Sequence, residues 1–152
     1  MRLTYFDAVP HREMLREYSI GAAFLERFRT ISRDELRHRQ DQRFRDVMKR
    51  GWEIPFYRRL WASKGIEPGD IQSLDDIAKL PTYQKSDIMA SVEANPPLGD
   101  FHGIESARPD VRPTVVLHTT SGTTGRPQPL LFGPTTREMQ NLRLARPYLR
   151  QG

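Results

Sequence analysis

The sequence predicts an α/β fold in which a helical N-terminal half leads into the first strands of a larger sheet that the chain does not finish. Capping residues, prolines and glycines divide residues 32–92 into short segments with apolar residues at helical spacing. Two short apolar runs, 114–118 and 128–132, follow a stretch rich in proline and glycine and are typical of strands. We therefore expect a poorly defined segment over 1–31 and one partial domain over 32–152.

Local start and stop signals predict the individual helices. Ser32 and Glu35 form an S-x-x-E capping box, and Gly51 is placed to end the helix that they begin. Pro55 suits the first turn of a second helix, because an N–H at that position would have no partner within the helix. Ser73 is expected to cap a third short helix. Three further segments with apolar residues at helical spacing are expected to be helices: 18–28, 82–92 and 134–149.

The composition excludes several classes of protein. There is no cysteine, which excludes disulfide scaffolds, thiolate zinc sites and cysteine nucleophiles. No run approaches the roughly 18 apolar residues of a membrane helix, and the charged N-terminus does not resemble a secretory signal. We therefore expect a cytoplasmic protein without a membrane partner. The net charge of +5 originates in residues 1–64, which hold 15 Lys and Arg against 9 Asp and Glu. Because the signs alternate there, a solvated helix face is favoured over nucleic-acid binding.

The residues that carry chemistry lie between the two predicted strands. Residues 119–127 read TTSGTTGRP, and seven of these nine are glycine, serine or threonine. Glycine lets a ligand approach the backbone N–H groups, the hydroxyls add donors, and the guanidinium of Arg126 suits phosphate oxygens. The pattern predicts an anion-binding loop, with an ordinary surface turn as the alternative. It matches neither G-x-x-x-x-G-K-[ST] nor G-x-G-x-x-G.

Other residues give weaker indications of a functional site. The four histidines share no i,i+3 or i,i+4 spacing, so we expect no metal site. His118 borders the loop, where it either contacts substrate or ends a strand in a structural role. Four aromatic residues at near-helical spacing are expected to form core rather than a stacking platform for bases: Trp52, Phe56, Tyr57 and Trp61.

The loop and the residues upstream of it resemble one enzyme family. The loop is similar to the phosphate loop of the adenylate-forming, AMP-forming acid ligases. Three upstream elements are similar to the phenylacetate–CoA ligase branch: IPFYR at 54–58, GI…DI…SLDDI at 65–77 and LPT…KSD at 80–87. The resemblance covers roughly residues 32–150. Gln128 stands where many acyl-CoA ligases carry lysine, and Arg126 before the proline is similar to the phenylacetate branch.

The resemblance implies the N-terminal portion of an ATP-dependent, AMP-forming carboxylic acid–CoA ligase, which activates an aryl acid such as phenylacetate as its acyl-adenylate. It implies ATP, Mg²⁺ and coenzyme A as cofactors. The residues that it assigns to binding of the ATP phosphates are Thr120, Ser121, Gly122, Thr123, Thr124, Gly125 and Arg126. It places no catalytic and no metal-binding residue within these 152 residues. We therefore expect a fragment that is inactive alone and needs the missing C-terminal part, in cis or as a separate chain.

Two alternatives stay open. An adenylating enzyme of the same branch could pass its acyl group to an acceptor other than coenzyme A, and nothing in the sequence separates the two. A basic nucleic-acid-binding module is the alternative from a different class, and it would show a steep inverse salt dependence.

Overall fold

A computed structural model describes residues 6–104, 115–121 and 125–151, except the side chains of 149–151. The chain divides into two compact units. The first comprises Met1–Ser32, Pro113–His118 and Leu130–Gly152, and the second comprises Arg33–Arg112 and Thr119–Pro129. Each unit is described by itself below. The predicted domain bounds, 1–31 and 32–152, stay a prediction.

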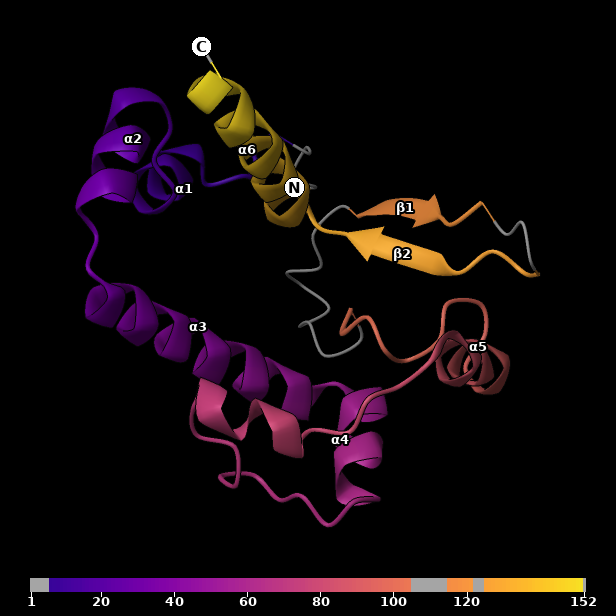
Figure 1. The fold of residues 1–152 in the computed structure, drawn as a ribbon. Helices are drawn as coiled ribbons and strands as arrows, with labels where there is room; N and C mark the ends of the chain where they lie inside the picture. Colours follow the sequence, from indigo (N-terminus) through magenta and orange to yellow (C-terminus); the bar gives the residue numbers. More distant parts are fainter. Residues whose placement is uncertain (1–5, 105–114, 122–124, 152) are drawn as a thin grey trace. The chain divides into compact units, whose positions relative to one another are not determined.

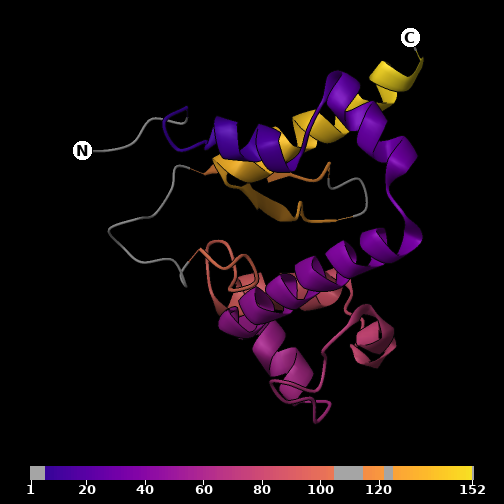
Figure 2. The ribbon, with the colours of Figure 1, turned by 90° about the vertical axis from the view of Figure 1, so that its left-hand side faces the viewer.

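The first unit is built mainly from helices α1 (His11–Glu17), α2 (Gly21–Thr30) and α6 (Pro134–Gln151). Helix α6 packs beside α2 (Figures 1 and 2). Arg146 of α6 ties this pair together, because its guanidinium lies 4.6 Å from the ring centroid of Phe24 and its Nη2 donates to the carbonyl of Ser19 at 3.2 Å. Its long side chain therefore gives both a cation–π contact and a hydrogen bond to the chain ahead of α2.

Strands β1 (Val116–Thr119) and β2 (Pro129–Phe132) form a two-stranded antiparallel hairpin (Figure 1). Pro129 is the first residue of its strand, a position at which a missing N–H is tolerated. The described residues are thus mostly helical with one two-stranded sheet. The prediction of helices followed by strands is confirmed to that extent.

The second unit is centred on the long helix α3 (Arg33–Glu53). Helix α4 (Pro55–Ala62) and the 3₁₀ helix η1 (Leu74–Lys79) pack on α3, and α5 (Lys85–Ala94) follows them in sequence (Figure 1). Nine residues form or border the core: Met48, Trp61 and Ile71, with Phe44, Trp52, Tyr57, Leu60, Ile66 and Leu80 around them. The prediction that the tryptophans and Tyr57 belong to the core is therefore confirmed, and Phe56 is buried as well.

Gly51 does not end α3, contrary to the sequence prediction, because the helix continues to Glu53. The residue is buried, and a Cβ at this position would lie 2.3 Å from Cη2 of Trp61. Glycine is therefore needed here because the indole ring packs against the helix backbone. The residue serves packing between α3 and α4, not helix termination.

The start of η1 follows the predicted capping pattern. The Ser73 hydroxyl accepts a hydrogen bond from the N–H of Asp75 at 3.2 Å, and the Asp76 carboxylate accepts one from the N–H of Ser73 at 3.1 Å. Lys79 donates to the same carboxylate at 2.7 Å, and this bond is the main reason that the pKa of Asp76 is lowered to about 2. The prediction of a capped segment is confirmed, although it forms a 3₁₀ helix.

Two other predicted helix starts are wrong by about one turn. Helix α2 begins at Gly21 and not at Tyr18, and α5 begins at Lys85 and not at Thr82. Helix α5 has its own capping box, in which the Asp87 carboxylate accepts the N–H of Gln84 at 2.7 Å. The carboxylate pairs with that N–H, so the helix starts after Gln84. Helix α1 lies in the segment that the sequence left undefined.

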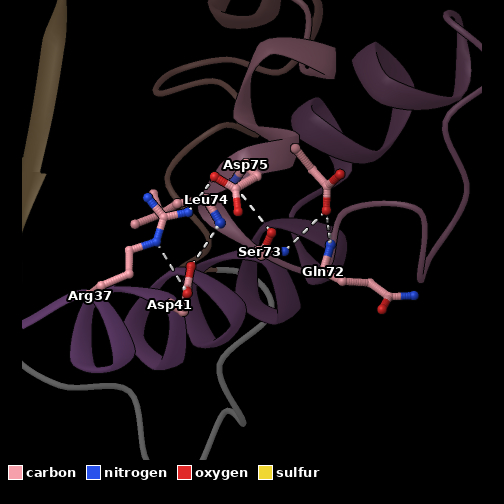
Figure 3. Close-up of polar contacts among 7 residues, drawn as sticks. Arg37, Asp41, Gln72, Ser73, Leu74 and Asp75 are labelled. Carbon is pink, nitrogen blue, oxygen red and sulfur yellow. Dashed lines mark hydrogen bonds and ion pairs between the residues drawn. The ribbon is translucent and has the colours of Figure 1, made fainter. Parts of the chain in front are cut away.

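Two side chains of α3 hold η1 in place (Figure 3). The Asp41 carboxylate accepts the N–H of Leu74 at 2.9 Å, a backbone donor at the start of η1 that no residue within the helix can satisfy. That hydrogen bond is the main cause of the lowered pKa of Asp41. Arg37 bridges the two elements, with contacts of 3.3 Å to Asp41 and 2.6 Å to Asp75. Asp41 of α3 and Asp75 of η1 therefore both have structural partners.

Candidate phosphate-binding loop

The predicted anion loop joins β1 to β2, and its two ends are held together by reciprocal hydrogen bonds. The N–H of Thr120 donates to the carbonyl of Gln128 at 3.1 Å, and the N–H of Gln128 donates to Oγ1 of Thr120 at 3.0 Å. Thr120 therefore uses its hydroxyl oxygen to close the loop, while its hydroxyl hydrogen can still donate to a ligand. Gln128 thus serves this closure through its backbone N–H and carbonyl.

Four of the seven predicted binding residues lie in the described part of the loop. They are Thr120, Ser121, Gly125 and Arg126, whereas Gly122, Thr123 and Thr124 lie outside the described residues. Gly125 has a φ of +152°, and a Cβ there would meet no atom of the described residues within 4 Å. The backbone is therefore open to a ligand at this glycine. Ser121 is exposed, so its hydroxyl is accessible as a further donor.

Arg126 reaches an acidic residue that sequence reasoning did not find. Its Nη1 lies 3.2 Å from Oε1 of Glu93, near the end of α5. Both side chains are exposed, at 76% for Arg126 and 66% for Glu93. The two residues are 33 positions apart, so no local sequence pattern signals their contact.

Helix α5 is itself fixed by a buried carboxylate. Asp100, which is 5% exposed, accepts two hydrogen bonds from Arg59 of α4, at 2.6 and 3.1 Å. It also accepts the hydroxyl of Ser91 at 2.8 Å, and its own N–H donates back to that hydroxyl at 3.0 Å. The guanidinium is the main reason that the pKa of Asp100 is lowered. This network links α4, α5 and the segment after α5, and so positions the helix that carries Glu93.

His118 has a structural contact on the strand side of the loop. Its Nε2 lies 2.7 Å from Nη1 of Arg137, and its ring meets Phe132 edge to face at 5.2 Å. A guanidinium can only donate, so Nε2 accepts and the ring hydrogen sits on Nδ1. This contact gives His118 a structural role on β1. A role in contacting substrate stays a prediction.

The described residues contain no group of three His, Asp or Glu side chains that could hold a metal ion. Their helices also include none that is long and apolar enough to cross a membrane.

Comparison with known proteins identifies relatives of the chain. No family model matches it. The phenylacetate-coenzyme A ligase of Escherichia coli K12 is 31% identical over 118 residues, which are 77% of this chain and 24% of that protein. The ligase of the same name from Pseudomonas putida is 38% identical over 106 residues, or 69% of this chain and 22% of that protein. The chain is a homologue of part of the phenylacetate-coenzyme A ligases.

A solved structure agrees with this relationship. The 2-hydroxyisobutyryl-CoA ligase in complex with 2-HIB-AMP and CoA is 36% identical, with a TM-score of 0.57 over 68% of this chain and 21% of that one. The resemblance to phenylacetate-coenzyme A ligases seen in the sequence is therefore confirmed. The chain spans only about a quarter of the length of these curated relatives, 24% and 22%. The roles of the individual loop residues stay a prediction.

Proposed function

We propose that the chain supplies the phosphate-binding segment of an ATP-dependent, AMP-forming acid–CoA ligase whose substrate is an aryl acid such as phenylacetate. The observation that carries the proposal is the TTSGTTGRP loop within a homologue of phenylacetate-coenzyme A ligases. Hydrogen bonds between Thr120 and Gln128 join the two ends of this loop. In the reaction, the carboxylate attacks the α-phosphate of ATP and pyrophosphate leaves. The thiol of coenzyme A then attacks the acyl carbon and displaces AMP.

The contribution of this chain is to bind and orient the β- and γ-phosphates. The N–H of Gly125 and the hydroxyls of Thr120 and Ser121 are donors, and Arg126 adds a positive charge that suits phosphate oxygens. These groups would stabilise the charge that gathers on the leaving pyrophosphate, which is an electrostatic and positional form of catalysis. The reacting acid and the thiol would be held by residues outside this chain.

Magnesium fits this arrangement as an ion carried by the phosphates. Mg²⁺ commonly keeps several water ligands and binds through substrate phosphates and one or two carboxylates. When bound, the ion would neutralise part of the negative charge of the phosphates, while the loop residues donate to their remaining oxygens.

Two arginines of α3 that are paired with acids favour this proposal over a nucleic-acid-binding role. Arg37 pairs with Asp41 and Asp75, and Arg39 pairs with Glu35 at 2.7 Å. Charges that are paired along a helix face leave less positive potential for a polyanionic backbone.

A hybrid enzyme tests the proposal. In it, this chain replaces the matching segment of the Pseudomonas putida ligase, and phenylacetate-dependent exchange of pyrophosphate into ATP is measured. We expect exchange in the hybrid, and a loss of about 10- to 1000-fold on Thr123→Ala, the range for removing one preorganised donor. Ser86→Ala, an exposed hydroxyl on α5, is the matched control. A folded hybrid without exchange, or one that Thr123→Ala leaves unchanged, contradicts the proposal.

A further inference from the structure

The contact between Arg126 and Glu93 places a carboxylate beside the only cation of the predicted loop. Glu93 lies on α5, which Ser91 and Asp100 anchor through a buried network, so the carboxylate is presented by a fixed helix. Among the described residues, Arg126 has one hydrogen-bonding partner, Glu93, and it reaches this partner through Nη1 alone. Carboxylate and phosphate oxygens require the same guanidinium N–H donors. An acid in this position therefore opposes any anion that binds Arg126.

We propose that Glu93 competes with polyphosphate for Arg126. Its carboxylate pairs with Arg126 until phosphate binds, and it thereby weakens the binding of the ATP phosphates and of pyrophosphate. The inference rests on the proposed function, because it requires Arg126 to bind phosphate. A polyphosphate that takes the Nη1 donor has to displace Glu93. One that binds the remaining N–H donors still meets a negative charge next to the guanidinium. Either way, the carboxylate lowers affinity, and it can recapture Arg126 as pyrophosphate leaves.

The expected size of the effect follows from the exposure of the pair. Ion pairs between solvent-exposed side chains contribute little, because water screens the charges and two long side chains must be ordered. Removing such a competitor should tighten polyphosphate binding by about two- to five-fold and no more. If Glu93 instead oriented Arg126 for phosphate, its removal would weaken binding. The sign of the change therefore separates the two roles.

Calorimetric titration of the chain with inorganic tripolyphosphate tests the inference. We expect Glu93→Gln to lower the dissociation constant about two- to five-fold. Glu67→Gln is the control, since it makes the same charge change at an exposed acid in the turn after α4. In the double variant with Arg126→Gln, the substitution at Glu93 should lose its effect.

Three outcomes would count against it. In the first, binding depends on Arg126, but Glu93→Gln weakens it or changes it no more than Glu67→Gln does. This result overturns the inference and leaves the proposed function standing. Tightening that persists in the double variant shows a general charge effect and also overturns the inference. Binding that is absent or does not depend on Arg126 overturns the role of the loop as well.

Discussion

Replacing Asp100 with asparagine should destabilise the second unit, because this carboxylate is the centre of the network that joins α4 and α5. The substitution keeps the shape of the side chain but removes its charge. It also turns one acceptor oxygen into an NH₂ group, which faces the guanidinium of Arg59 in either orientation, because each carboxylate oxygen accepts a hydrogen bond from Arg59. Donor then meets donor, and a buried hydrogen-bonding group loses its partner.

The magnitude follows from the contacts that are lost. Hydrogen bonds to a charged group contribute about 1.5–3 kcal/mol each, and Asp100 accepts three of them. Arg59 is 57% exposed and can be rehydrated, which reduces the loss on its side. We therefore expect the free energy of unfolding to fall by about 2 kcal/mol. With a urea slope of about 1–3 kcal/mol per molar, the midpoint should fall by roughly 1 M.

The dependence on pH provides a second readout. The pKa of Asp100 is lowered in the folded chain, so its ionised form stabilises the fold. This stability is fully present above the unfolded pKa of about 3.9 and is lost as the pH falls through the lower folded pKa. The wild-type chain should therefore lose stability on acidification below about pH 4, and Asp100→Asn should lose less.

Urea unfolding monitored by circular dichroism measures both the loss of stability and its dependence on pH. Asp46→Asn, the same substitution at an exposed aspartate of α3, is the control and should change stability by less than about 0.5 kcal/mol. If Asp100→Asn behaves like this control, or if its stability at neutral pH equals that of wild type, the argument about the buried network is refuted.

Two further stability changes are expected. Gly51→Ala should destabilise the chain by about 1–2 kcal/mol, because the gain in helix propensity is smaller than the cost of the clash with Trp61. As a control, Gly133→Ala should be near neutral, because a Cβ there meets no atom of the described residues within 4 Å. An unchanged near-ultraviolet spectrum and midpoint for Gly51→Ala would contradict the packing described for α3 and α4. Ser73→Ala should cost about 1 kcal/mol through the lost cap of η1, and equal stability of the two proteins in thermal unfolding would count against that cap.

Local chemistry explains which parts of the fold could be predicted. Ser73 and Asp76 are three residues apart and make their bonds within one turn, so their pattern shows in the sequence. In the sequence, a glycine that terminates a helix cannot be told from one that lets an aromatic ring of another helix pack against the backbone. The ring that packs on Gly51 belongs to Trp61, ten positions away. The wrong prediction at Gly51 thus reflects tertiary packing.

The candidate site shows the same difference between local features, which the sequence predicts, and long-range contacts, which it does not. The composition of residues 119–127 predicted an anion loop, because the required donors are adjacent in the chain. Its neighbours are not adjacent: Glu93 is 33 positions from Arg126, and Asp100 is 41 positions from Arg59. Ion pairs at such separations depend on how the helices pack. They therefore became visible only in the structure.

The central claim, that residues 120–126 bind the phosphates of a nucleotide, is tested most directly by NMR titration of the ¹⁵N-labelled chain with tripolyphosphate. The account predicts weak but saturable shifts at the amides of Ser121 and Gly125 and at the side-chain N–H groups of Arg126, and a clear loss of affinity on Arg126→Gln. Shifts confined to the arginines of α3, or shifts at the loop that do not saturate and are unchanged in that variant, would contradict it.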